Sequence, residues 1–109
     1  MAKKTQQSTP APQWKAVDLG GVEWQFAFVS AEDVAIVTGD TETLGVCEDH
    51  RYSDSPKIMV TDSLKGRKRL NTTLHELLHA ADIFKTEQWV EQTANEIERI
   101  LTEDGWVRK

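Results

Sequence analysis

Apolar and polar residues alternate in several short segments of the first sixty residues. In residues 21–29, apolar side chains occupy every second position, as Trp24, Phe26 and Phe28 show. This two-residue period is typical of a strand with one buried face. Three further segments have strand-like composition: residues 33–40, 43–50 and 57–62. The pattern therefore predicts a small sheet of about four strands.

The period changes to that of a helix after residue 66. There is no Gly or Pro between Arg67 and Phe84, and the apolar residues recur at helical spacing. We expect this apolar stripe to anchor the helix to the sheet: Leu70, Leu74, Leu77, Leu78 and Ala81. A second helix is predicted from Thr86, its N-cap, to about Glu103, and Gly105 should end it.

Strands come first and helices second, which indicates an α+β fold. We expect a small twisted sheet, antiparallel or mixed, with both helices packed on it. The chain has 109 residues and four tryptophans, which suits one domain with a small core to which the tryptophans contribute much. Residues 1–13 are polar and are predicted to form a disordered arm, so residues 14–109 form the single domain.

Composition narrows the possible partners. The net charge is −5, and residues 1–54 account for it, with four basic against nine acidic residues. A nucleic-acid-binding domain is basic overall or along one stripe, so we expect no nucleic-acid partner. No apolar run approaches the roughly 18 residues that span a bilayer, so we expect no membrane partner. The single Cys47 cannot form an internal disulfide, which suits a reducing, cytoplasmic setting.

The predicted first helix contains the motif H-E-x-x-H, formed by His75, Glu76 and His79. Histidines four positions apart share a helix face and can bind one zinc ion at about 2.0–2.1 Å. The intervening Glu is the general base in metallopeptidases with this motif. A shuffled sequence of this composition is expected to contain only roughly 0.005 matches.

The helical wheel separates these histidines from the apolar stripe. At about 100° per residue, His75 and His79 lie about 40° apart, on the side away from the leucines. Core histidines would lie on the stripe instead. We therefore expect His75, His79 and Glu76 to face a cleft, and solvent-exposed histidines without a metal are the remaining alternative.

A catalytic zinc site usually has three protein ligands and one open position. The second helix offers Glu87, Glu91 and Glu98 on one flank. Glu98 lies nearly two turns further on and is a weaker candidate. Spacing alone does not choose between Glu87 and Glu91.

The segment "KIMVTDSLKGRKRLNTTLHELLHA", followed by "WVEQTAN", resembles the compact gluzincin-like metallopeptidases of bacteria and phages, in the broad ImmA/IrrE-type group. The resemblance implies a minimal zincin-like domain with Zn²⁺ as its cofactor. It also implies His75 and His79 as ligands, Glu76 as base, and Glu91 as third ligand, in an E-x-x-A pattern. A phage origin would make the host cytoplasm its location.

The predicted function is therefore a zinc-dependent endopeptidase acting on a peptide or protein substrate. A substrate could pair with residues 57–62 if these form an edge strand, and His50, Arg51 or Tyr52 could stabilise the oxyanion. The sequence identifies no substrate-binding residues, specificity or oligomeric state. The alternative is a small interaction protein, stabilised by metal or independent of it, that inhibits or regulates a partner without cleaving it.

Overall fold

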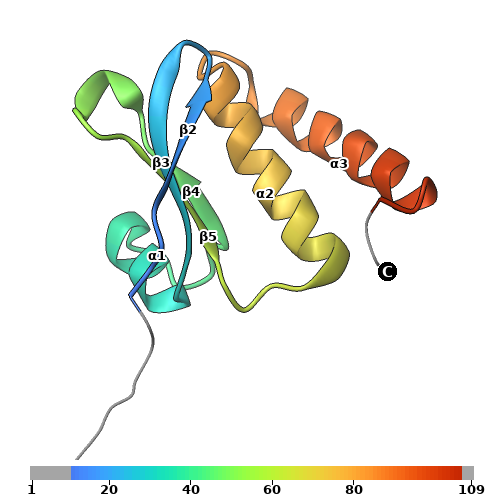
Figure 1. The fold of residues 1–109 in the computed structure, drawn as a ribbon, viewed down its shortest axis with the longest axis horizontal. Helices are drawn as coiled ribbons and strands as arrows, with labels where there is room; N and C mark the ends of the chain where they lie inside the picture. The colour runs from blue at the N-terminus through green and yellow to red at the C-terminus, as the bar shows by residue number, and fades with distance from the viewer. Residues whose placement is uncertain (1–10, 107–109) are drawn as a thin grey trace, which may run out of the picture.

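The structure is a computed structural model that describes residues 11–106, and Figure 1 shows its strands and helices. The elements in chain order are β2 (Lys15–Leu19), β3 (Val22–Val29), α1 (Ala31–Thr38), β4 (Gly45–Cys47), the short 3-10 helix η1 (His50–Tyr52), β5 (Lys57–Thr61), α2 (Gly66–Ala81) and α3 (Glu87–Glu103). The predicted α+β class is confirmed. The predicted disordered arm lies mostly outside the described residues.

The four strands form one mixed sheet in the order β2-β3-β5-β4. The central pair, β3 and β5, is parallel, and Phe26 lies opposite Ile58. The outer strands β2 and β4 run antiparallel to their neighbours. Because β5 has a strand on each side, the prediction that residues 57–62 could offer a free edge to a peptide is wrong. The edge on that side of the sheet is β4.

The segment predicted as a strand at residues 33–40 is instead the helix α1. Ser30 caps its first turn, since the Oγ accepts a hydrogen bond from the Asp33 backbone N–H at 3.1 Å. Gly39 ends it in the left-handed conformation, with a φ of 75°. A cap at each end outweighs the weak preference of four β-branched residues for a strand.

The sheet contains one strand that the apolar pattern does not predict, β2. It pairs with β3 through a two-residue Gly20-Gly21 turn in which both φ angles are positive, at 60° and 78°. Paired glycines with positive φ are typical of tight hairpins. The Gly-Gly pair before residue 22 was therefore a usable signal in the sequence.

Helices cover both faces of the sheet. On one face, Val34 of α1 packs with Ala27, Val29 and Met59. On the other, Ala80 of α2 packs with Trp24 and Ile58. Trp24 is fully buried, whereas the other three tryptophans are at least 40% exposed, so the expectation that tryptophans dominate the core is wrong.

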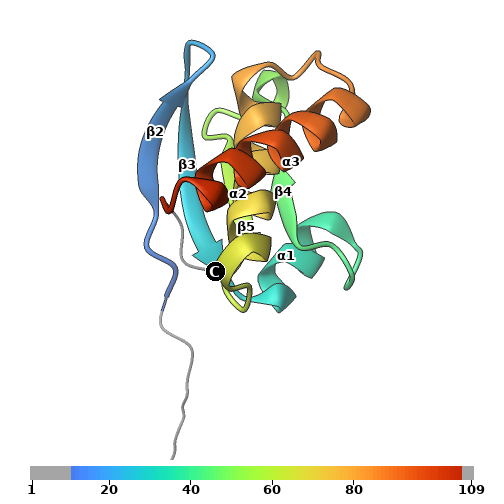
Figure 2. The ribbon, with the colours of Figure 1, turned by 90° about the vertical axis from the view of Figure 1, so that its right-hand side faces the viewer.

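The last helix, α3, packs mainly on α2 and not on the sheet, as the two views show (Figures 1 and 2). The predicted two-layer arrangement, with both helices on the sheet, is wrong in this respect. The buried side chains of α3 are Val90, Ala94 and Thr102. Among residues 11–106, no helix combines the length and the apolar character needed to cross a bilayer.

Candidate metal centre

Helix α2 packs against the sheet on one side and against α3 on another, and this packing determines which of its residues face the cleft. Glu76 and Ala80 are its buried side chains, on the side of the sheet. Asn71 marks the side of α3, because its Nδ2 donates to Oδ1 of Asn95 at 2.8 Å. On the helical wheel, His75 and His79 fall between these two sides. They are therefore held at the groove where α3 and the sheet diverge.

The apolar stripe of α2 anchors the helix to the sheet only in part, through Leu77. Ala81 is exposed and Leu74 and Leu78 are only half-buried, whereas Ala80 and Leu77 join the sheet-facing core. The wheel places Leu74 and Leu78 towards the side marked by Asn71. A helix that packs against two elements needs two apolar faces, and periodicity alone does not assign them.

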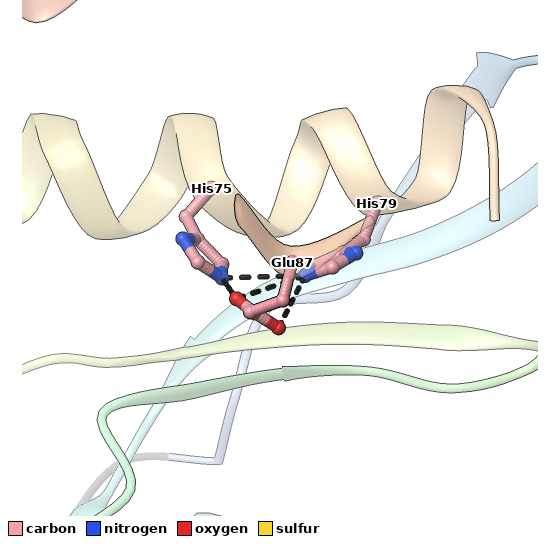
Figure 3. A group of neighbouring side chains, drawn as sticks. All are labelled: His75, His79 and Glu87. Carbon is pink, nitrogen blue, oxygen red and sulfur yellow. Dashed lines mark hydrogen bonds and ion pairs between the residues drawn. The ribbon is translucent and has the colours of Figure 1, made fainter. Parts of the chain in front are cut away.

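Three side chains converge at the groove, as Figure 3 shows: His75, His79 and Glu87. The His75 Nε2 lies 2.5 Å from Oε1 of Glu87, and the His79 Nε2 lies 3.2 Å from Oε2. The two Nε2 atoms are 3.2 Å apart. The histidine side chains are 22% and 23% exposed and that of Glu87 is 68% exposed, so the cluster is open to solvent on the side of Glu87.

The third member of this cluster is Glu87, whereas the resemblance implied Glu91. The two helices are joined by a short connection, residues 82–86, which brings the first turn of α3 level with the end of α2. Thr86 caps that turn, accepting from the Trp89 backbone N–H at 3.0 Å. Glu91 is exposed, one turn further along α3, and is not part of the cluster. The structure thus favours the alternative that spacing had left open.

The donor set suits a zinc ion. Tetrahedral zinc with ligands at about 2.05 Å separates the ligand atoms by about 3.3 Å. The distances between the two histidines and from His79 to Glu87 are close to this value. The His75–Glu87 distance of 2.5 Å is shorter, so these two side chains would have to move apart to bind a metal. Two imidazole Nε2 atoms in such contact attract each other only if a proton lies between them. A cation removes that requirement, since both rings then present lone pairs. The geometry therefore fits a metal at this position.

Glu76 is buried next to this cluster. Only 8% of the residue is exposed. Burial, and then the negative charge of Glu87, raise the pKa of its carboxyl to about 7. A carboxyl group that titrates near neutral pH is suited to accept and return a proton.

The cluster opens into a cleft of about 480 Å³ between α2 and the edge strand β4. Glu76 lines it together with His75, His79 and Glu87 from the helices. Opposite them lie Gly45, Val46 and Cys47 of β4. Burial and the neighbouring carboxylates Glu76, Glu48 and Asp49 raise the pKa of the Cys47 thiol to about 12. Four acidic residues line the cleft: Glu48, Asp49, Glu76 and Glu87.

The three proposed oxyanion candidates do not line this cleft. His50 packs edge-on against Trp24, with ring centroids 5.8 Å apart. Arg51 is engaged by the carboxylate of Asp49 at 2.7 Å, and Tyr52 is 83% exposed. The sequence placed them near the site because they precede β5, but η1 turns them away from it.

No protein-family model matches the chain, and no curated protein or solved structure is significantly similar to it.

Proposed function

We propose that this protein is a zinc-dependent metallopeptidase. The observation that carries the proposal is the convergence of His75, His79 and Glu87 beside a buried Glu76, in a cleft bordered by a strand edge. Histidine pairs of this spacing with an adjacent Glu serve zinc peptidases, and the resemblance in residues 57–80 points to the same chemistry. A cytoplasmic location and a peptide or protein substrate belong to this proposal.

His75, His79 and Glu87 would hold the metal and leave one position open. When bound, zinc would supply Lewis acidity at that position, which makes water more acidic and polarises a carbonyl oxygen. The Glu76 carboxylate accepts a proton from the attacking water and delivers it to the nitrogen of the leaving amine. Its burial keeps the carboxylate from being solvated by bulk water, which favours proton transfer within the cleft.

The substrate backbone would lie along β4. Backbone groups alternate in direction along an antiparallel strand. The Leu44 carbonyl accepts from Thr61 N–H, and Glu48 N–H donates to the Lys57 carbonyl, so residues 44 and 48 point towards β5. By alternation, the N–H and C=O groups of Gly45 and Cys47 point away from β5, where an extended peptide can pair with them.

Metal analysis tests the site first. Purified protein should contain about one zinc per chain, as expected for a single His₂Glu site, and His79→Ala should lose it. Wild-type protein that binds no zinc at micromolar concentration would contradict the metal centre. Glu76→Gln removes the base but no ligand, so it should keep the zinc and lose cleavage of a proteome-derived peptide library.

A metal that only joins α2 to α3 is the rival explanation, with the protein acting as an inhibitor or regulator. The burial of Glu76 weighs against this rival. Isolating a carboxyl group from water is destabilising, and a purely structural metal site does not require such a group. If Glu76→Gln behaves as the wild type in every assay, and a partner is recovered uncleaved, the rival is correct. Recovery that persists in chelator would show that the interaction does not depend on the metal.

A further inference from the structure

Gly45 lies in the middle of the cleft wall, where its backbone does not require glycine. Five glycines have positive φ angles, and Gly45 is not among them. Its register partner is Val60, in a regular antiparallel ladder. Any residue can adopt such an extended conformation. The reason for a glycine here must therefore be space.

That space is filled by Glu76. A Cβ placed on Gly45 would lie 3.0 Å from Cγ and 3.1 Å from Oε2 of Glu76. It would also lie 3.1 Å from the carbonyl oxygen of Met59. The Met59 carbonyl belongs to a central strand and cannot easily retreat, whereas the Glu76 side chain can rotate. An added methyl group would thus displace the carboxylate.

The position of Cys47 supports the same placement. Cys47 is two residues further along β4, on the face that Gly45 shares, and the Glu76 carboxylate is among the charges that raise the pKa of its thiol. The Glu76 side chain therefore lies over the backbone of β4. It is held between the strand and its own helix.

We propose that Gly45 is a positioning residue: its missing side chain lets the Glu76 carboxylate lie against β4 within reach of the His75–His79–Glu87 cluster. This inference rests on the proposed peptidase function, in which Glu76 is the base. Misplacement of a catalytic group by about 1 Å can cost about a hundredfold in rate, so a shift of a few tenths of an ångström should cost about 3- to 10-fold. None of the three ligands is among the atoms nearest to a Cβ placed on Gly45, so zinc affinity should not depend on this residue.

The test compares Gly45→Ala with the wild type as zinc-loaded full-length protein, on the best-cleaved peptide of a proteome-derived library. We expect kcat to fall by about 3- to 10-fold, while KM and the zinc dissociation constant stay the same. Gly21→Ala is the matched control. It adds the same methyl group at a strained hairpin position with no atom within 4 Å, so it lowers stability without reaching Glu76. Its kcat should be that of the wild type.

A double-variant cycle in chelator gives a readout independent of activity. Glu76→Asp shortens the side chain and makes room for the methyl group, so the Tm loss of Gly45→Ala/Glu76→Asp should be smaller than the two single losses together. Additive losses, or a Gly45→Ala enzyme with wild-type kcat, would overturn the positioning role. A zinc-loaded wild type that cleaves nothing would contradict the peptidase function instead, and the cycle would still decide whether Gly45 places Glu76.

Discussion

Glu87 and Glu91 lie one turn apart on the same helix, and the position of the carboxylate distinguishes their roles. The Glu87 carboxylate contacts both histidines, whereas Glu91 is exposed and outside the cluster. Loss of even a residue that orients a ligand typically weakens metal binding about 10- to 100-fold. Glu87→Gln should therefore weaken zinc binding by at least about 100-fold, measured by competition with a chromophoric chelator.

The matched variant is Glu91→Gln, which changes the same charge on the same helix. Its zinc affinity should equal that of the wild type, because long-range attraction between exposed charges is screened. If Glu91→Gln loses zinc and Glu87→Gln keeps it, Glu91 is the ligand, as the resemblance implied.

Cys47 tests the electrostatics of the cleft without involving a ligand. Its thiol has a pKa raised to about 12 by burial and by nearby carboxylates, so little thiolate exists at neutral pH. In metal-free protein at pH 8, alkylation by iodoacetamide should be at least about a hundredfold slower than in the urea-unfolded chain. The rate should continue to rise as the pH is raised to 10. A rate that levels off near pH 8.5 would show that the thiol has an ordinary pKa, and that burial and the nearby carboxylates do not raise it.

At the scale of the element, variants of two helix N-caps distinguish an effect on stability from an effect on metal binding. Ser30 caps α1 and Thr86 caps α3, and each side chain accepts a hydrogen bond from a backbone N–H. Removing either cap should cost about 1 kcal/mol in urea unfolding. Only α3 carries a metal ligand in its first turn. Thr86→Ala should therefore also weaken zinc binding, and Ser30→Ala should leave it unchanged. Equal zinc affinities in the two variants would mean that the cap does not order Glu87.

The elements themselves were predictable to different degrees. β3, α2 and α3 follow from regular periods, β5 follows from a short apolar run, and the prediction of Thr86 as a cap is confirmed. The β-branched residues of α1 favour a strand, whereas the Ser30 and Gly39 caps favour the helix that is observed. β2 has too few apolar residues to show a period, since only Val17 and Leu19 face the core. Short elements depend on their ends and neighbours more than on their own pattern.

At the scale of the whole molecule, the metal would link two helices that have no covalent constraint beyond a short connection. A ligand that binds only the folded state stabilises it by about 2.7 kcal/mol at 100 times its Kd. For a domain of this size that corresponds to a Tm rise of about 10 °C or more. Differential scanning calorimetry of zinc-loaded protein against protein in EDTA should show this rise. Glu87→Gln should lose most of it at the same zinc concentration.

The histidine pair and its base were available from the sequence, because a four-residue spacing on a helix is a local property. His75, Glu76 and His79 need only the helical period to share a side of α2. The identity of the third residue depends on how α3 crosses α2, which the 82–86 connection and the packing of Val90 and Ala94 determine. The edge strand, too, depends on strand order.

The sequence by itself thus determined the α+β class, the two long helices and the H-E-x-x-H triad, because each rests on short-range periodicity. Only the tertiary structure decided that Glu87 meets the histidines, that β4 borders the cleft, and that Gly45 makes room for Glu76. These contacts join residues eight to thirty-one positions apart. Packing between elements brings such residues together, and no local pattern records it.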